Sequence, residues 1–336
     1  ASLRVRLPLS LDSQMGPVVV PDDEKAVRGL TTLGSGEHWV LKPRYLGDGL
    51  WTPGIRAGVV PGSEFHLTEY FAPVIGVMRV DTLQEAIEAV NAVDYGLTSG
   101  IQTLDATELA IWLEGVQAGN LYVNRGITGA IVRRQPFGGW KRSAIGSTTK
   151  AGGPSYLLGL GEVEPARGQG GKVEQGTAAL DPRVANLCDA VSSQLDAADL
   201  AELRRALVAD AAAWRTAYGA NRDVTGLACE RNILRYREVD VVVRAGQGTV
   251  LADVVRVMAA GVRAGGFISL SVADRLPQPL QNALLAAGVQ VAVEDQGAWD
   301  ARLAELAASG GLGTRVRAIG PREETSAARW SHASRV

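Results

Sequence analysis

Residues 74–80 have the sequence Val-Ile-Gly-Val-Met-Arg-Val, and residues 81–90 continue as Asp-Thr-Leu-Gln-Glu-Ala-Ile-Glu-Ala-Val. The first stretch is a short apolar run, which is typical of a buried strand. The second stretch changes period and places its apolar residues on one face of a helix, at Leu83, Ala86, Ile87 and Val90. This change of period predicts a strand followed by a helix.

Helix start signals support the same reading. Asp81 can cap the helix while Gln84, three residues on, reaches back to it. Asp105 and Glu108 repeat that signal before a second helix. Further strands are expected around Ile101 and Leu104, and from Leu121 to Val123. Strands that alternate with helices of about 10 to 15 residues predict an α/β fold with a largely parallel sheet.

The second half of the chain repeats the alternation after a break. Residues 162–176 lack an apolar period and have the composition of an exposed linker. Beyond them we expect a helix with Leu200, Leu203, Leu207, Ala211 and Trp214 on one stripe, strands at 239–243, 267–272, 289–293 and 314–319, and helices at 250–262, 280–287 and 299–308. The pattern is Rossmann-like. It predicts a domain at 1–161, the linker, a second domain at 177–320 and a flexible tail at 321–336.

Composition excludes several classes of function. The 336 residues carry a formal net charge of -2 without long runs of one sign, so nucleic acid is not an expected partner. The sequence has no apolar stretch of about 18 residues and no secretory leader, which predicts no membrane span and a cytoplasmic location. Two cysteines and three scattered histidines give no metal-ligand spacing, so no metal site is expected.

The first ten residues lack an initiator methionine and begin directly with apolar alternation. We therefore expect a piece of a longer polypeptide, although a processed start would have the same appearance.

Residues 67–74, Leu-Thr-Glu-Tyr-Phe-Ala-Pro-Val, resemble the Glu-x-Phe-x-Pro signature of the aldehyde dehydrogenase family. The resemblance implies that Glu69 accepts hydrogen bonds from the nicotinamide ribose of NAD and that Phe71 packs against the cofactor. A carboxylate suits vicinal hydroxyls, and a flat ring offers a stacking face. The alternative is an exposed glutamate beside a core phenylalanine.

Four further motifs follow in order: Gly-Asn-Leu-Tyr-Val-Asn-Arg at 119–125, Thr-Gly-Ala-Ile-Val at 128–132, Gln-Pro-Phe-Gly-Gly at 135–139 and Lys-Ala-Gly-Gly-Pro at 150–154. Together they resemble the active-site loop of L-glutamate γ-semialdehyde dehydrogenases, in particular those fused to proline dehydrogenase in bacterial bifunctional enzymes. The resemblance covers roughly the first 160 residues.

That resemblance assigns the substrate's α-carboxylate to Gly129 and Ala130. A glycine lets the backbone approach closely, and consecutive N–H groups can hold a carboxylate. Phe137 would then form an aromatic wall for the short aliphatic chain. The alternative for a single glycine is a turn that merely reverses the chain.

The expected catalytic groups are absent from this chain. Members of the family attack the aldehyde with a cysteine thiolate, pass hydride to NAD and activate water with a glutamate base. We expect the nucleophile and the base upstream of Ala1, and therefore assign no catalytic residue here. Cys188 and Cys229 lie beyond the family's catalytic half and are expected to be small, buried or half-buried side chains.

Two features of the second half remain. Gly246-Gln247-Gly248 begins a dinucleotide fingerprint, but the third glycine position is Leu251 and the acid Glu294 falls too far along. Residues 230–236 resemble a segment of the non-catalytic C-terminal domain of longer bifunctional proline-catabolic enzymes, which packs on the catalytic module and helps to enclose a substrate tunnel.

The sequence therefore predicts part of an NAD-dependent L-glutamate γ-semialdehyde dehydrogenase that acts in proline catabolism and is inactive alone. Its expected partners are the substrate and the rest of the dehydrogenase module, with a homo-oligomer as a further expectation. FAD would enter only with an upstream proline dehydrogenase domain. The alternative is a non-catalytic scaffold or interaction module descended from the enzyme.

Overall fold

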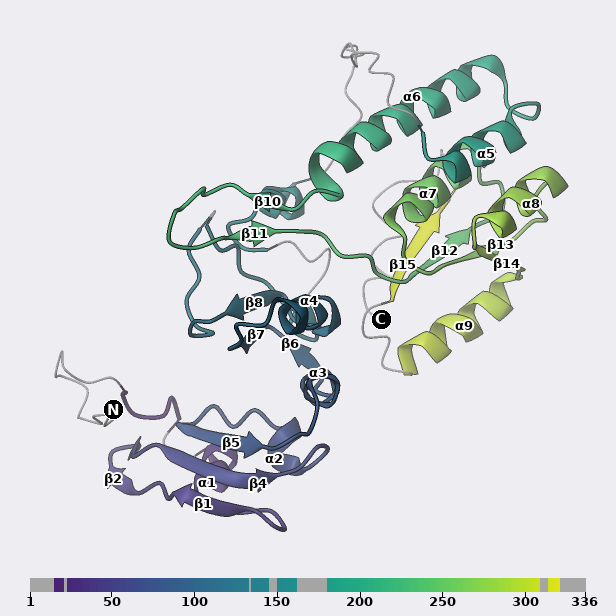
Figure 1. Ribbon diagram of the computed structural model, residues 1–336. Coiled ribbons are helices and arrows are strands. Elements are labelled where there is room, and N and C mark those ends of the chain that lie inside the picture. The colour runs from purple at the N-terminus through teal and green to yellow at the C-terminus, as the bar shows by residue number, and fades with distance from the viewer. Residues whose placement is uncertain are drawn as a thin grey trace. The chain divides into compact units, whose positions relative to one another are not determined.

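The computed structural model describes residues 15–20, 23–132, 134–144, 150–161, 180–308 and 314–320. Helices alternate with strands, several of them paired in parallel, so the predicted α/β class is confirmed (Figure 1). Contacts divide the chain into two compact units. Unit 1 consists of Ala1–Gly129 and Gly138–Ile145, and unit 2 of Ala130–Phe137 and Gly146–Val336.

The first part of unit 1 is a three-stranded sheet with the strand order β1-β4-β5. Strand β4 pairs with β1 antiparallel and with β5 parallel. The elements are α1 (Glu24–Thr31), β1 (His38–Leu41), β2 (Tyr45–Gly47), β3 (Leu50–Trp51), β4 (Gly54–Val59), α2 (Glu64–Leu67) and β5 (Val74–Met78). Helix α2 lies in the connection between the two parallel strands.

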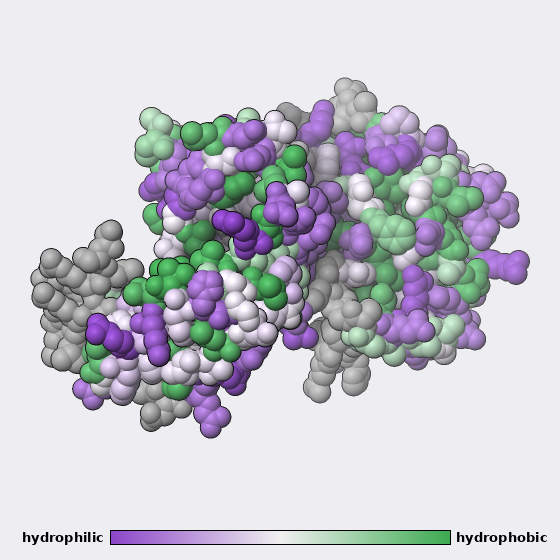
Figure 2. Space-filling view, turned by 60° about the horizontal axis from the view of Figure 1, so that its bottom comes forward, coloured by the Kyte–Doolittle hydropathy of each residue, from purple (hydrophilic) through white to green (hydrophobic). Residues whose placement is uncertain are grey.

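The sheet leaves apolar side chains exposed on β1 and β5, among them Val40, Leu41, Ile75 and Val77. Figure 2 shows hydrophobic residues gathered between hydrophilic ones on the face in view. Exposed apolar groups of this kind usually mark a surface that further protein covers.

The second part of unit 1 is a helix-linked pair of parallel strands. Helix α4 connects β7 to β8, and α3 packs on α4 around buried Ile87 and Trp112. The elements are α3 (Leu83–Asn91), β6 (Tyr95–Gly96), β7 (Thr98–Ile101), α4 (Ala106–Gly115), β8 (Asn120–Val123) and β9 (Trp140–Lys141). Strand β7 ends at Ile101, and Leu104, which was expected to extend it, is fully exposed.

The two predicted helix caps have different outcomes. Asp105 caps α4 as expected, because its carboxylate accepts from the Glu108 N–H group. The prediction that Asp81 caps α3 is wrong by one residue. Thr82 is the N-cap and accepts from the Glu85 N–H at 3.2 Å, while the Glu85 carboxylate accepts from the Asp81 N–H at 2.9 Å.

Unit 2 contains a parallel sheet with the strand order β14-β13-β12-β15. Chain order runs outward from β12 in one direction and then returns to its other side, as in the first four strands of a doubly wound fold. The predicted Rossmann-like pattern is confirmed. The core includes fully buried Val255, Met258, Leu270, Leu280 and Leu284.

The helices and strands predicted beyond residue 177 are present with shifted ends, whereas the strand pair between residues 222 and 234 was not predicted. The elements of unit 2 are η1 (Tyr156–Leu160), α5 (Pro182–Val191), α6 (Ala197–Ala213), η2 (Trp214–Tyr218), β10 (Arg222–Asp223), β11 (Ile233–Leu234), β12 (Val241–Ala245), α7 (Leu251–Ala264), β13 (Ile268–Val272), α8 (Gln278–Ala286), β14 (Gln290–Val293), α9 (Gln296–Ala308) and β15 (Arg315–Ile319). Strand β13 begins at Ile268, which is paired with Val241 of β12, so the expected first residue, Phe267, lies just outside the strand.

The predicted linker at 162–176 and tail at 321–336 lie outside the described residues, so the division into sequence domains stays a prediction. Within the described ranges, none of the helices combines the length and the apolar character that crossing a bilayer would need.

Candidate cofactor and substrate residues

The loop that carries Glu69 and Phe71 is fixed by the residue between them. Tyr70 is only 7% exposed, its ring stacks on Phe65 at a centroid distance of 5.0 Å, and its hydroxyl donates to Glu64 at 3.2 Å. Burial, together with the nearby Glu64 carboxylate, raises the pKa of the Tyr70 phenol. Glu69 and Phe71 are both exposed on either side of this anchor.

The buried side chain of Arg56 contacts the aromatic ring on which Tyr70 stacks. Arg56 lies on β4 and donates to the Glu37 carboxylate at 2.8 Å and to the Gly29 carbonyl. Its guanidinium carbon lies 3.9 Å from the Phe65 ring centroid and 4.7 Å from that of Trp39. The Phe65 ring, on which Tyr70 stacks, therefore contacts the cation of the Arg56–Glu37 ion pair. Both side chains of that pair are almost fully buried.

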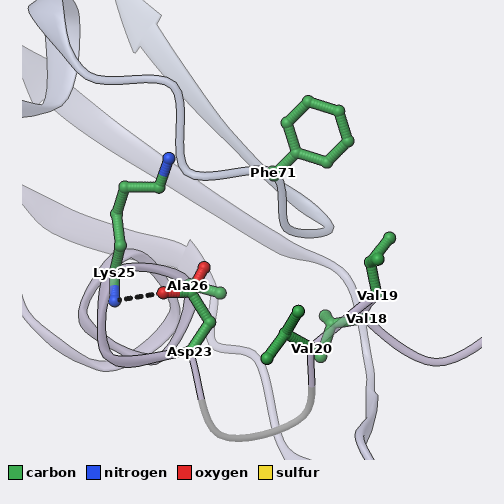
Figure 3. Close-up of a pocket in the computed structure, with 7 residues that line it drawn as sticks. All are labelled: Val18, Val19, Val20, Asp23, Lys25, Ala26 and Phe71. Carbon is green, nitrogen blue, oxygen red and sulfur yellow. Dashed lines mark hydrogen bonds between the residues drawn. The ribbon is translucent and has the colours of Figure 1, made fainter.

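Phe71 has an unusual backbone and a cavity beside it. Its φ is +52°, in the left-handed region that bulky residues rarely adopt, and it is 67% exposed. The alternative that it is a core residue is therefore wrong. A cavity of about 230 Å³ is lined by Val18, Val19, Val20, Asp23, Lys25, Ala26 and Phe71 (Figure 3). Glu69 does not line this cavity.

Gly129, at the end of a unit 1 segment, has a φ of +95°. Its carbonyl accepts a hydrogen bond from the hydroxyl of Tyr122, a buried residue of β8, at 2.8 Å. Because any side chain at this φ would be strained, glycine is required by the backbone here.

Ala130 and Phe137 belong to unit 2, where they are the ends of one loop. Ala130 is exposed. Inside the loop, the Gln135 N–H donates to the Ile131 carbonyl at 2.7 Å, which forms a turn. Phe137 is half-buried and exchanges two backbone hydrogen bonds with Ala151, at 3.0 and 2.8 Å. We refer to residues 130–137 as the substrate loop, after the role that the sequence predicts for Ala130 and Phe137.

The middle of the substrate loop contacts residues almost a hundred positions further along. Arg134 forms an ion pair with Glu230, and the Gln135 side chain donates to that of Asn232 at 3.3 Å. The sequence motifs did not indicate this pairing. The one signal was that residues 230–236 resemble a domain that packs on a catalytic module.

Lys150 adjoins the Phe137 bridge through its neighbour Ala151. Burial of its amine lowers the pKa of Lys150 to about 8. At neutral pH Lys150 is still largely protonated, but a larger fraction of it carries an uncharged amine than in an exposed lysine.

The glycine fingerprint and the two cysteines also lie in unit 2. After β12, the Thr249 hydroxyl donates to the Gly246 carbonyl at 2.6 Å and to the Ile319 carbonyl at 3.1 Å, so the partial glycine fingerprint is closed by its own hydrogen bonds. Cys188 lies in the core as expected, and burial raises the pKa of its thiol. The prediction of a buried or half-buried side chain is wrong for Cys229, which is exposed. Across the described ranges, no three His, Cys, Asp or Glu side chains are grouped so as to hold a metal ion.

Comparison with known proteins shows what the first half of the chain is similar to. Residues 1–160 match the sequence profile of the aldehyde dehydrogenase family. We refer to these residues as the aldehyde dehydrogenase segment, after the profile that they match. The aldehyde dehydrogenase segment contains all five candidate residues, from Glu69 to Phe137.

Two curated relatives show how far the similarity extends. A 1-pyrroline-5-carboxylate dehydrogenase of Bacillus pumilus is 36% identical over 153 residues, which cover 45% of this chain and 29% of the relative. The Bifunctional protein PutA of Rhizobium meliloti is 30% identical over 321 residues, covering 93% of this chain and 25% of the relative. The second match therefore continues well beyond the aldehyde dehydrogenase segment.

Among solved structures, Proline Utilization A from Corynebacterium freiburgense is 39% identical, with a TM-score of 0.67 over 83% of this chain and 29% of its own. The chain spans less than a third of the length of each of these three relatives. The resemblances drawn from the sequence, to aldehyde dehydrogenases and to proline-catabolic relatives, are confirmed.

Proposed function

We propose that this chain is part of an NAD-dependent aldehyde dehydrogenase that oxidises L-glutamate γ-semialdehyde to L-glutamate in proline catabolism. The observation that carries the proposal is the 36% identity of the aldehyde dehydrogenase segment to a 1-pyrroline-5-carboxylate dehydrogenase. The four ordered motifs between residues 119 and 154 support the same substrate.

For the cofactor, we propose Glu69 and Phe71 as contacts. The exposed Glu69 carboxylate can accept two hydrogen bonds from the vicinal hydroxyls of a ribose. The exposed Phe71 ring and the valines of the adjoining cavity offer an apolar wall. At about 230 Å³, the cavity is smaller than the ~300–1,000 Å³ of complete small-molecule sites, so it suits one part of a dinucleotide. When bound, NAD would supply the hydride acceptor.

For the substrate, we propose that the N–H groups of Gly129 and Ala130 hold the α-carboxylate. Backbone N–H groups can bind an anion without a full counter-charge, which suits a segment whose glycine has a positive φ. Phe137 would pack against the aliphatic part of the substrate, and its backbone is held by the bridge to Ala151.

The nucleophilic cysteine and the glutamate base are assigned to protein outside this chain. Cys188 is buried in the core of unit 2, and Cys229 also lies beyond the aldehyde dehydrogenase segment. The exposed apolar residues of β1 and β5 fit a surface that the rest of the dehydrogenase module covers. We therefore propose that the chain is inactive alone.

The remaining residues are proposed to be the C-terminal domain of a longer bifunctional enzyme, because the match to the Rhizobium meliloti protein covers 93% of the chain. A proline dehydrogenase with bound FAD would then belong to the same polypeptide. The flavin absorbance of the protein purified from its natural source tests this, and a colourless protein would exclude it.

The test of the dehydrogenase is NAD reduction with L-glutamate γ-semialdehyde, followed by NADH absorbance. This chain is compared with the same chain joined at its N-terminus to a segment that carries the family's nucleophilic cysteine. Activity only in the joined protein is expected. Activity in neither would favour the alternative of a non-catalytic scaffold, and activity in the chain alone would refute the assignment of the nucleophile.

The cofactor contact is tested in the joined protein with Glu69→Gln. Loss of charged hydrogen bonds should raise the KM for NAD by roughly tenfold or more, while the KM for the aldehyde changes little. Glu88→Gln, an exposed residue of α3, is the matched control. An unchanged KM for NAD in the Glu69 variant would refute this role.

A further inference from the structure

We propose that Glu230 and Asn232, which belong to the C-terminal half, are positioning residues that hold the substrate loop in its binding conformation. The structural part of this inference depends only on contacts within unit 2. Its consequence for the substrate rests on the proposed function.

Two side-chain contacts join the loop to these residues. The Arg134 guanidinium donates from Nε to Glu230 Oε1 at 2.6 Å, and its Nη2 contacts the same oxygen. The ion pair is partly buried, with side chains 34% and 25% exposed. Gln135 donates to Asn232 at 3.3 Å. Two consecutive loop residues, Arg134 and Gln135, therefore contact Glu230 and Asn232, which lie two positions apart. We refer to residues 230–232 as the partner segment.

The partner segment is itself pinned in place. The Asp223 carboxylate, at the end of β10, accepts from the N–H and hydroxyl of Thr225, at 3.0 and 2.7 Å, and from the N–H of Asn232, at 3.1 Å. The Asn232 amide then donates to Glu230 at 2.9 Å and to Thr225 at 3.2 Å. These hydrogen bonds lower the pKa of Asp223 to about 2, as expected for a carboxylate that accepts several donors.

Two further backbone contacts support the loop. Its end is fixed by the Phe137 bridge to Ala151 and its interior by the turn at Ile131. Without Glu230, the segment between Ala130 and the bridge loses its ion pair to the rest of unit 2. A loop with few anchoring contacts samples open conformations, and a ligand that needs one conformation then binds more weakly.

The structural part is tested in the full chain by hydrogen exchange. Glu230→Ala should speed exchange of the amides of residues 130–132, 134, 135 and 137 by roughly tenfold, while the amides of β12 and β13 keep their rates. Glu238→Ala, an exposed glutamate close by in sequence, is the matched control. The charge-swapped double variant Arg134→Glu with Glu230→Arg should restore slow exchange. Unchanged exchange in Glu230→Ala would overturn the inference.

The consequence for the substrate is tested in the enzyme joined to its nucleophile-bearing segment. Glu230→Ala should raise the KM for the aldehyde by about tenfold, leave the KM for NAD and kcat within about twofold, and be rescued by the charge swap. Faster exchange with an unchanged KM would overturn the positioning role. If exchange responds as expected but the parent enzyme does not oxidise the aldehyde, the proposed function fails and the loop anchor stands.

Discussion

Replacing Arg56 with leucine should destabilise the sheet beneath the Glu69–Phe71 loop. The variant removes a guanidinium that is 2% exposed and leaves Glu37 as a buried carboxylate with a side chain 3% exposed. It also removes the donor to the Gly29 carbonyl and the cation beneath the Phe65 ring. Nothing in leucine replaces these polar contacts.

The expected magnitude follows from the burial of the pair. Removing one member of a buried, hydrogen-bonded ion pair costs roughly 3–5 kcal/mol, because the remaining charge is left without a partner. A loss of about 3 kcal/mol corresponds to a change in the opening equilibrium on the order of 100-fold. The double variant Arg56→Met with Glu37→Met should recover most of the loss, since no buried charge then remains.

Hydrogen exchange of the β4 amides, at residues 54–59, measures this local stability without requiring the two units to unfold together. Exchange should be about 100-fold faster in Arg56→Leu. Arg28→Gln is the control, because it breaks an ion pair with Glu64 in which both side chains are about half exposed or more. If the two single variants behave alike, the argument from burial is refuted.

Three further outcomes are expected. Asp223→Asn should abolish the acid sensitivity of the β10–β11 pair. The Asp223 carboxylate, with a folded pKa of about 2, stabilises the folded state above about pH 4 and loses that contribution as the pH falls towards 2. Hydrogen exchange of the β10 and β11 amides, measured against pH, checks this. The folded protein should become more stable between pH 8 and about 10.4, because in that range the Lys150 amine is deprotonated when buried but still protonated in the unfolded chain. Lys150→Met should remove this rise in stability, and urea unfolding at several pH values in that range measures it. Gly119→Ala should destabilise unit 1 by about 1–3 kcal/mol or more, because its Cβ would lie 1.8 Å from the Gly138 carbonyl oxygen, and thermal unfolding measures the loss.

The sequence predicted elements where one pattern had no competitor. The stripe of Leu203, Leu207 and Ala211 is buried on α6, and Asp105 caps α4. At α3, by contrast, Asp81 with Gln84 and Thr82 with Glu85 are equally good capping boxes. The structure uses the second. The capping signal alone does not decide between them.

The sequence motifs predicted which residues are candidates for binding, but not which of them are buried or what they contact. Tyr70 and Phe71 are adjacent aromatics, and the sequence does not show which one is buried; the packing of Phe65 and Arg56 decides it. The ion pair of Arg134 with Glu230 joins residues 96 positions apart, and no periodic pattern carries information over that separation. Contacts of this kind appear only once the fold brings the segments together.

That separation also has a consequence for the newly made protein. At roughly 5–20 residues per second, a ribosome needs about 5–20 seconds to add the 96 positions between Arg134 and its partner. During that interval the nascent chain has already produced the substrate loop but not the carboxylate that holds it. The loop therefore acquires its anchor late in translation, and a chain that stopped before residue 230 would lack it.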